Sequence, residues 1–224
     1  MTPLLVLRPQ PGADATAERI RARGLVAVVA PLFERRPVAW DPPSSNEMDH
    51  LLVTSAAVFE HGGAGLNAYL HLPMVAVGHA TAAAARTAGF DSVEVAEGGN
   101  VRAAAERLTE LGARRVLHLA GEDRIEADVP GALVTRIAVY AATPVDPPPA
   151  FHQAIDGGAV ALVHSPRAGE RLASLVADQN DIVIVAISAA AAAAAGAGWR
   201  HTVVAENPTD EAVIDAAAAL VREE

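Results

Sequence analysis

The sequence predicts an α/β protein of two similar domains, each a parallel sheet flanked by helices. Short apolar runs alternate with helical stretches along the chain, and this order is typical of parallel sheets covered on both faces. A block of sequence also occurs twice, about 110 residues apart, which indicates a duplication. With only two copies, each too long for a solenoid repeat, we expect two related domains that enclose a cleft, where small ligands usually bind.

The two copies share three segments in the same order. The first copy contains LLVTSAAV, VAVGHATAAAA and VEVAEGGN, and the second contains ALVHSPRA, VAISAAAAAAA and TVVAENPT. In this alignment Ser55 corresponds to Ser165, and Gly78 corresponds to Ser188.

The elements are predicted from apolar spacing and from the residues that begin and end each stretch. Ala13–Arg23 is a helix because Asp14 lies near its start, arginines crowd its end and Gly24 follows. Arg35–Trp40 alternates and precedes Pro42, so it is predicted to be extended. The predicted strands are Leu4–Leu7, Leu25–Ala30, His50–Thr54, Met74–Val77, Val93–Val95, Val116–Ala120, Val134–Ala141, Val160–His164, Val183–Ile187 and Thr202–Ala205. The other helical regions are Ser55–Leu70, Ala80–Ala88, Val101–Leu111, Arg167–Ala177, Ala189–Ala197 and Asp210–Arg222.

The domains are not simply the two halves of the chain. The C-terminal copy has three strands and needs the two N-terminal strands to match the middle block. We therefore expect residues 1–34 and 145–224 to form one discontinuous domain and residues 41–136 to form the other. Residues 35–40 and 137–144 then join them as a pair of extended linkers, which together act as a hinge.

Composition excludes several classes of function. The chain has 224 residues, a net charge of −10 and no long basic stretch, so nucleic acid is not expected as a partner. All 17 basic residues are arginines and there is no cysteine, which excludes lysine Schiff bases, a P-loop lysine, thiol catalysis and iron–sulfur sites. The eight histidines have no metal-binding spacing, and no GxGxxG follows a strand. We expect no metal, no cofactor, no membrane span and a monomer in the cytoplasm.

Short motifs scattered over the whole chain resemble the uroporphyrinogen-III synthase family. Their order and spacing carry the resemblance, since no single one is specific. The motifs are Arg8-Pro9, Pro31-Leu32, Thr54-Ser55, Val77-Gly78-x-Ala80-Thr81-Ala82, Val139-Tyr140, Thr143, Ser165-Pro166 and Asn207-Pro208-Thr209.

The resemblance implies two α/β domains joined by a two-stranded linker, with the active site between them and no cofactor. It also implies the cyclisation of hydroxymethylbilane, a linear tetrapyrrole with carboxylate side chains, to uroporphyrinogen III with inversion of ring D and loss of water. This chain departs from the family pattern at Ser188 and Ala190, which weakens the hydroxyl contacts expected from the second copy.

Tyr140 is the candidate catalytic residue, because it lies on the second crossing between the domains. The reaction needs a weak acid that helps a hydroxyl group leave, and a phenol can donate that hydrogen bond without carrying a charge. A tyrosine that only fills the domain junction is the alternative.

The candidate substrate-binding residues lie where predicted strands end. Gly78, His79 and Thr81 begin a helix whose free N–H groups attract carboxylates, and Ser55 and Ser165 begin the corresponding helices elsewhere. The alternative for the hydroxyl groups is ordinary helix capping, which is compatible with binding. Arg8 and Arg167 also follow strand ends and suit carboxylate pairing, with surface ion pairs as the alternative.

Two other functions remain open from the sequence. One is a non-catalytic two-domain protein that binds an anionic small molecule, which the weaker second copy favours. The other is a nucleotide-binding regulator, which thermal stabilisation by nucleotides would distinguish.

Overall fold

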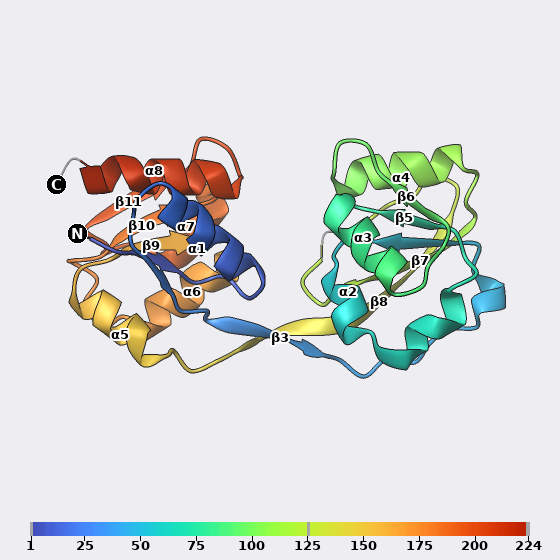
Figure 1. Ribbon diagram of the computed structural model, residues 1–224, viewed down its shortest axis with the longest axis horizontal. Helices are drawn as coiled ribbons and strands as arrows, with labels where there is room; N and C mark the ends of the chain where they lie inside the picture. The colour runs from blue at the N-terminus through green and yellow to red at the C-terminus, as the bar shows by residue number, and fades with distance from the viewer. Residues whose placement is uncertain (1, 125, 223–224) are drawn as a thin grey trace. The chain divides into compact units, whose positions relative to one another are not determined.

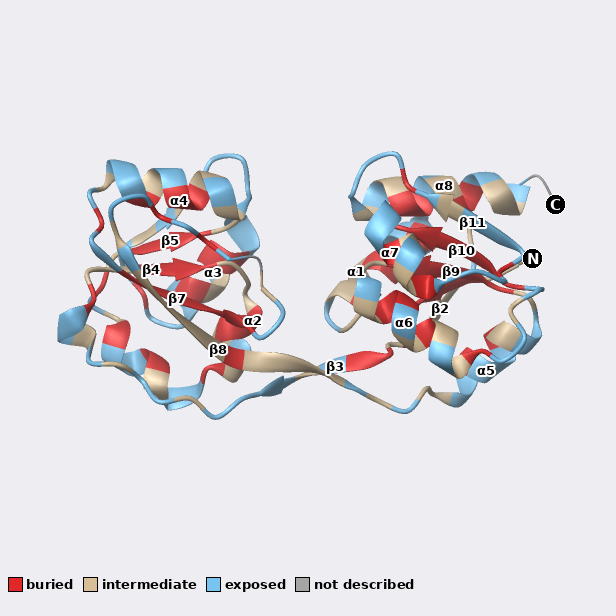
Figure 2. Ribbon diagram, turned by 180° about the vertical axis from the view of Figure 1, so that it is seen from behind, coloured by how far each residue is buried: buried red, intermediate tan, exposed pale blue. Residues whose placement is uncertain are grey.

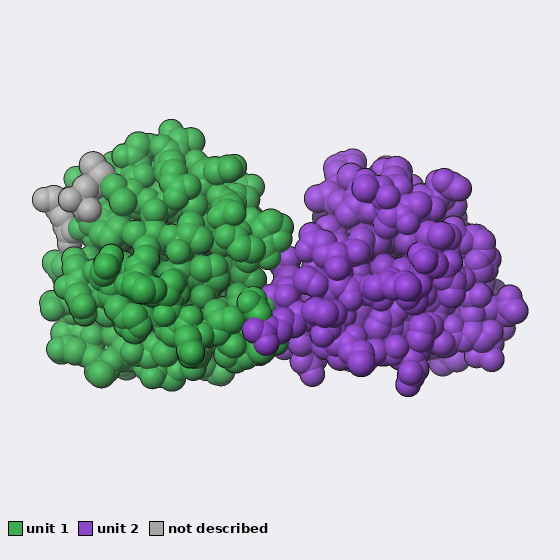
Figure 3. All heavy atoms as spheres, turned by 60° about the horizontal axis from the view of Figure 1, so that its bottom comes forward, with its two compact units in different colours: residues 1–34, 143–224 green, residues 35–142 purple. Residues whose placement is uncertain are grey.

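The chain folds into two compact α/β units, one of which is discontinuous in sequence. The computed structural model describes residues 2–124 and 126–222. Residues 1–34 and 143–224 form the first unit, and residues 35–142 form the second (Figure 3).

The first unit contains a five-stranded sheet in which every neighbouring pair is parallel (Figure 1). Its order is β11-β10-β9-β1-β2, so the N-terminal strand β1 lies between β9 and β2. The register places Leu4 opposite both Ala27 and Val160. The strands are β1 (Leu4–Val6), β2 (Ala27–Val29), β9 (Val160–Val163), β10 (Val183–Ala186) and β11 (His201–Val204).

Helices cover both faces of this sheet, because alternate residues of each strand point to opposite sides. One face carries Leu4, Val6 and Leu162, which pack with residues of α1 and α8 in one apolar cluster. The central strands are buried on both faces (Figure 2). The helices of the unit are α1 (Gly12–Ala22), α5 (Pro149–Asp156), α6 (Pro166–Leu175), α7 (Ala189–Ala195) and α8 (Asp210–Arg222).

Helices α6 and α7 approach each other closely at Gly169. A Cβ added at Gly169 would lie 2.8 Å from the carbonyl oxygen of Ala191 and 2.9 Å from the backbone nitrogen of Ala195. The alanine run of α7 therefore has a packing role at one face, where Ala191 and Ala195 are buried.

The second unit contains a six-stranded sheet with the order β3-β8-β7-β4-β5-β6. Its pairs among β4 to β8 are parallel. The edge strand β3 is antiparallel to β8, since backbone bonds join Val38 to Val139 and Val145 to Leu32, so one index rises as the other falls. The strands are β3 (Phe33–Pro37), β4 (His50–Val53), β5 (Met74–Ala76), β6 (Val93–Val95), β7 (Arg115–Gly121) and β8 (Leu133–Pro144).

This mixed sheet modifies the prediction of two purely parallel sheets. The two stretches predicted as linkers pair with each other, and residues 35–40 and 137–142 lie within the second unit. The chain passes from one unit to the other at the boundary between residues 34 and 35 and returns between residues 142 and 143.

Two apolar clusters sandwich the second sheet. On one face Leu51, Leu117 and Leu119 pack with α2, η2 and α3, and on the other Leu52 and Val116 pack with α4. The helices of this unit are α2 (Ala57–His61), α3 (His79–Thr87) and α4 (Val101–Glu110), with the 3-10 turns η1 (Ser45–Glu47) and η2 (Gly63–Tyr69).

One helix, α5, is not among the elements predicted from the sequence. Pro148 and Pro149 lie at its start, Phe151 and Ala154 are buried three residues apart, and Gly157 follows its end. This helix is not predicted because a run of prolines precedes it and indicates extended backbone. Proline is nevertheless common in the first turn of a helix.

The methyl group of Gly169→Ala overpacks the contact with α7, which costs about 1–3 kcal/mol, and alanine returns about 1 kcal/mol in helix propensity. The free energy of unfolding should therefore fall by up to about 2 kcal/mol. Urea unfolding measures the change, with Glu170→Ala on the exposed side of α6 as the control. A Gly169→Ala protein as stable as the wild type would show that the close approach is not needed.

Candidate functional site

The predicted site residues lie at the carboxyl ends of the strands in their own units. Arg8 follows β1 and Ser165 follows β9 in the first unit, while Ser55 follows β4 and Gly78 follows β5 in the second. The carboxyl ends of parallel strands share one edge of a sheet, which is where open α/β sheets bind ligands.

Tyr140 lies on β8 of the second unit with its ring half-buried. Its ring centroid is 5.8 Å from that of His61 on α2, and the Cζ atom of Arg35 lies 5.9 Å from the Tyr140 centroid. Across residues 2–124 and 126–222, the phenol hydroxyl of Tyr140 has no hydrogen-bond partner. A half-buried phenol with an uncommitted hydroxyl is able to donate a hydrogen bond to a bound ligand.

Helix α3 begins at Gly78 without a side-chain cap. Gly78 occupies the N-cap position with φ +84°, a backbone conformation that favours glycine. A Cβ at Gly78 would meet nothing within 4 Å, so the space in front of the first turn is open. His79 is exposed as the first residue of the helix, and the first-turn N–H groups are available to an anion.

Thr81 does not point into this space. Its side chain is 5% exposed, and it lies on the buried face of α3 with Ala82 and Ala85. Thr81 therefore packs the helix against its sheet, and the exposed residues of the first turn are His79 and Ala80.

The hydroxyl groups of the candidate serines accept bonds from their own backbone. Ser165 caps α6 by accepting from the backbone N–H of Ala168 at 3.2 Å. Ser55 accepts from the N–H of Ala57 at 3.3 Å, which is a turn before α2 and not the predicted N-cap. Ser188 caps α7 through the N–H of Ala191 at 3.2 Å, so the two copies differ in that α3 is uncapped and α7 is capped.

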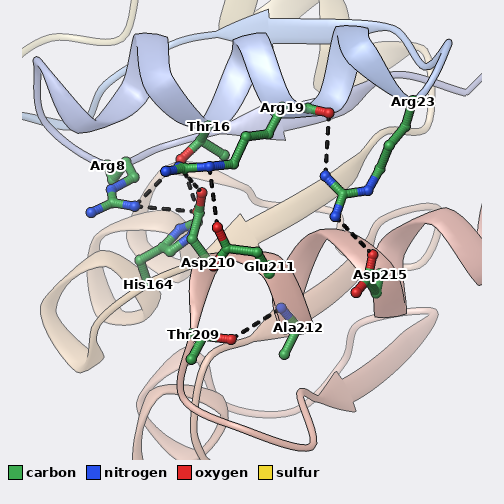
Figure 4. A network of polar contacts seen from close by, with 10 residues as sticks. All are labelled: Arg8, Thr16, Arg19, Arg23, His164, Thr209, Asp210, Glu211, Ala212 and Asp215. Carbon is green, nitrogen blue, oxygen red and sulfur yellow. Dashed lines mark hydrogen bonds and ion pairs between the residues drawn. The ribbon is translucent and has the colours of Figure 1, made fainter.

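Arg8 belongs to a network of charged and polar side chains centred on Asp210 (Figure 4). The carboxylate of Asp210 accepts from Arg8 at 3.2 Å, Thr16 at 2.8 Å and Arg19 at 2.7 Å. The Nε2 atom of His164 lies 2.7 Å from the same carboxylate. The side chain of Asp210 is 11% exposed, and that of His164 is 7% exposed.

These donors control the ionisation of Asp210. Burial alone raises the pKa of the Asp210 carboxyl, but the hydrogen bonds from His164 and Thr16 and the charge of Arg8 outweigh it and hold the pKa well below its usual range. Asp210 is therefore a permanently charged acceptor at neutral pH.

The role of Asp210 is not predicted from the sequence. Local pattern identifies Asp210 only as the first residue of a helix, and His164 only as the end of a strand. The sole sequence signal is that His164 directly precedes Ser165 at a strand end.

Arg167 lies in the first turn of α6, and its Cζ atom is 5.0 Å from the ring centroid of Phe33. The geometry is that of a cation–π contact. Arg167 is half-buried at the same edge of the first sheet as Ser165.

A second buried polar group, His118, lies on β7 of the second unit. Its side chain is fully buried, and within the described part of the chain neither ring nitrogen has a hydrogen-bond partner. Burial, together with the charges of Arg124 and Arg136, lowers the pKa of His118 to about 4. The imidazole is thus neutral at physiological pH.

Over residues 2–124 and 126–222 no three histidine, aspartate or glutamate side chains gather as metal ligands would. The donors at both strand edges are instead N–H, guanidinium and hydroxyl groups, which suit carboxylates.

Comparison with protein families identifies one family. A family profile described as uroporphyrinogen-III synthase HemD matches residues 14–215. No curated protein sequence matches the chain.

The chain is also similar to solved structures. The uroporphyrinogen-III synthetase of Helicobacter pylori 26695 aligns with a TM-score of 0.65 at 15% identity, over 98% of this chain and 99% of that one, and this likeness shows the fold. A mutant uroporphyrinogen III synthase of the extremely thermophilic bacterium Thermus thermophilus aligns with a TM-score of 0.46 at 14% identity, over all of both chains.

Asp210→Asn should lower the free energy of unfolding by about 2 kcal/mol at pH 7, because a neutral amide cannot accept from all four donors and removes the charge that the partly exposed Arg8 and Arg19 share. The pKa of Asp210 is depressed by folding, so its contribution is present above pH ~4 and is lost as the pH falls further. Urea unfolding at pH 7 and pH 3 measures both effects.

The difference in stability between wild type and Asp210→Asn should therefore shrink towards pH 3. Asp215→Asn is the control, since the carboxylate of Asp215 is 65% exposed and pairs with Arg23 at the surface, and it should change stability by less than about 1 kcal/mol. Equal losses for the two variants would contradict a special role for Asp210.

Proposed function

The chain belongs to the uroporphyrinogen-III synthase family, and from this premise we propose which of its residues carry out the reaction. The protein is an enzyme of tetrapyrrole biosynthesis, a lyase that cyclises hydroxymethylbilane to uroporphyrinogen III with inversion of ring D and loss of water. The profile covers residues 14–215, and the comparisons do not support the alternative of a non-catalytic binding protein.

We propose that Tyr140 assists the departure of the substrate hydroxyl. The carbon–oxygen bond of the hydroxymethyl group breaks, and the leaving oxygen needs a proton to depart as water. The phenol of Tyr140 donates the hydrogen bond that stabilises the developing charge on that oxygen. Ring D then bonds to the new cationic carbon through its substituted carbon, its old bond to the chain breaks, and the chain re-bonds to the unsubstituted carbon of ring D. That carbon loses its proton, which replaces the proton taken up by the leaving water, so the atoms balance.

The observation that supports this role is the uncommitted hydroxyl of Tyr140. Its ring is packed against His61 and Arg35, yet its hydroxyl is not bonded to any described residue. Tyr69 provides a contrast, because its ring is fully buried and its hydroxyl donates to the carbonyl of Pro43 at 2.6 Å.

We propose that the first turn of α3 holds a substrate carboxylate. Gly78 leaves the space in front of the helix open, and the backbone N–H groups of His79 and the following residues are the donors. Thr81 supports this turn by packing beneath it. The capped helix α7 of the first unit offers a weaker anchor, because Ser188 already satisfies one of its N–H groups.

Arg8, Ser55, Ser165 and Arg167 are proposed as further substrate contacts. Arg8 uses Nη1 on Asp210 and Thr16, and its side chain is 32% exposed, which leaves other guanidinium N–H groups for a carboxylate. Arg167 stands at the start of α6 beside the Ser165 cap. The two arginines supply positive charge to a protein whose net charge of −10 opposes a polyanionic substrate.

We further propose that the enzyme acts as a cytoplasmic monomer without nucleic-acid partners. Among the described residues, the large apolar side chains that are exposed are only Val26, Val38, Leu133 and Val204. No helix in the described ranges has the length and apolar character needed to cross a bilayer. Light scattering after size exclusion is the measurement for the monomer.

Tyr140→Phe should reduce kcat for uroporphyrinogen III by about 100-fold, within the range for losing a general acid. The assay mixes enzyme with hydroxymethylbilane, oxidises the products and resolves the porphyrin isomers. Fold and KM should be nearly unchanged, because the aromatic ring stays in place.

The matched control is Tyr69→Phe, which removes a hydroxyl from the only other tyrosine and should affect stability more than kcat. Turnover at the wild-type rate by Tyr140→Phe would remove Tyr140 from the mechanism. If the wild-type protein itself yields only the type I isomer, the assigned activity is wrong.

His79→Asp should raise KM by about tenfold, because a carboxylate at the first position of α3 competes with the substrate for the N–H groups. The same substitution should leave stability equal or slightly higher, by roughly a few tenths of a kcal/mol, since an acidic residue suits a helix N-terminus.

Ala189→Asp makes the equivalent change at the first position of α7, where Ser188 caps the helix, and it should raise KM less. Steady-state kinetics and urea unfolding on all three proteins test the proposal. Equal effects of the two substitutions on KM would contradict a preferred site at α3.

A further inference from the structure

The position of Tyr140 depends on an irregularity in the pairing of β7 with β8. Leu119 lies opposite Ile137 and Ala120 lies opposite Ala138, but Gly121 lies opposite Tyr140. Val139 is therefore one extra residue on β8. Such a bulge reverses which face the following side chain occupies, because side chains alternate along a strand.

The extra residue determines the neighbours of Tyr140. With uninterrupted pairing, Tyr140 would share a face with Arg136 and Ala138. Because of the bulge it joins the face of Leu119 and Ile137, where it packs against the cluster that includes α2 and η2. The backbone bond from the N–H of Glu122 to the carbonyl of Tyr140, 2.8 Å long, resumes the pairing after the bulge.

The residue opposite Tyr140 has to be glycine for the ring to lie where it does. A Cβ at Gly121 would lie 2.7 Å from Cε2, 2.8 Å from Cζ and 3.0 Å from the hydroxyl oxygen of Tyr140. Real Cβ atoms essentially never come within 3.0 Å of another heavy atom. The phenol end of the ring thus rests directly over the backbone of Gly121.

The ring cannot simply move aside to accommodate a methyl group. His61 lies against it with a centroid separation of 5.8 Å, and the guanidinium of Arg35 lies 5.9 Å from its centroid. Gly121 itself is buried and is not in the left-handed region, so alanine fits its backbone conformation. Any effect of Gly121→Ala therefore comes from contact with the ring.

We propose that Gly121, together with the bulge at Val139, is a positioning element that places the hydroxyl of Tyr140 for the reaction. This inference rests on the proposed role of Tyr140 and extends it to two residues that do not touch substrate. Displacing a reacting group by about 1 Å costs up to roughly 100-fold in rate. The ring of Tyr140 would have to move by roughly this distance to make room for a methyl group at Gly121.

The first test is a double-mutant cycle with Gly121→Ala and Tyr140→Phe. Gly121→Ala alone should lower kcat between about 10- and 100-fold while KM changes less than about twofold. In the Tyr140→Phe background the same substitution should cost little further, because the hydroxyl that it misplaces is already gone.

The control is Gly65→Ala. A Cβ at Gly65 would lie 2.9 Å from the ring of Trp40, so this change crowds an aromatic ring of the same unit without contacting Tyr140. It should lower stability without the fall in kcat. Urea unfolding of every variant separates a loss of fold from a loss of placement.

A second readout observes the ring without using activity. With 3-fluorotyrosine incorporated, the fluorine spectrum has one resonance for each of the two tyrosines, and Tyr140→Phe assigns them. Gly121→Ala should shift the Tyr140 resonance and leave that of Tyr69 in place, whereas Gly65→Ala should leave the Tyr140 resonance in place.

The outcomes are distinguishable. The inference is overturned if Gly121→Ala keeps the wild-type kcat, if its loss of kcat is as large in the Tyr140→Phe background, or if the Tyr140 resonance does not move. If Tyr140→Phe turns over at the wild-type rate, the proposed catalytic role fails, and the fluorine spectra still decide whether Gly121 places the ring.

Discussion

The carboxylate of Asp210 joins the two separated stretches of chain that make up the first unit. It accepts from Arg8, Thr16 and Arg19 of the N-terminal stretch and contacts His164 of the C-terminal stretch. These contacts connect the ends of β1 and β9 with the beginning of α8, so the edge of the sheet that presents Arg8 and Ser165 is shaped around one buried charge. In a buried position such a charge is tolerable only because its oxygens are hydrogen-bonded.

The second unit relies on open backbone at its strand edge. Gly78 keeps the N-terminus of α3 open, and Gly121 leaves room for the ring of Tyr140. Both positions work through the absence of a side chain, although for different reasons. Gly78 has a positive φ, while Gly121 faces an aromatic ring. The two copies have thus diverged. Charged side chains shape the strand edge of the first unit, whereas glycines without side chains shape that of the second.

The order and type of nearly all elements could be predicted from the sequence, because their signals are local. Short apolar runs ended by proline or glycine marked strands such as β1 and β9, and the repeat indicated that the N-terminal strands belong with the C-terminal copy. Relations between distant residues could not be predicted in this way. Apolar spacing does not reveal that β3 runs antiparallel to β8, that Thr81 faces inwards, or that Arg8 meets Asp210.

The same distinction applies to Tyr140. Its chemistry and its place on a segment that joins the two domains could be inferred from residue type and position. The bulge that determines which face of the sheet its side chain occupies could not. A one-residue shift in register leaves no trace in composition or periodicity, and Gly121 looks like any other glycine at the end of a strand.

The place of β1 between β2 and β9 in the first sheet also has a consequence during synthesis. Its residues Leu4–Val6 are completely apolar and buried between β2 and β9, yet β9 leaves the ribosome only after the whole second unit has been made. The nascent N-terminal segment must therefore remain unpaired on one edge while the inserted unit emerges and folds. An unpaired apolar strand edge is prone to aggregation, so the arrangement that completes the first unit also leaves its earliest residues exposed to aggregation during synthesis.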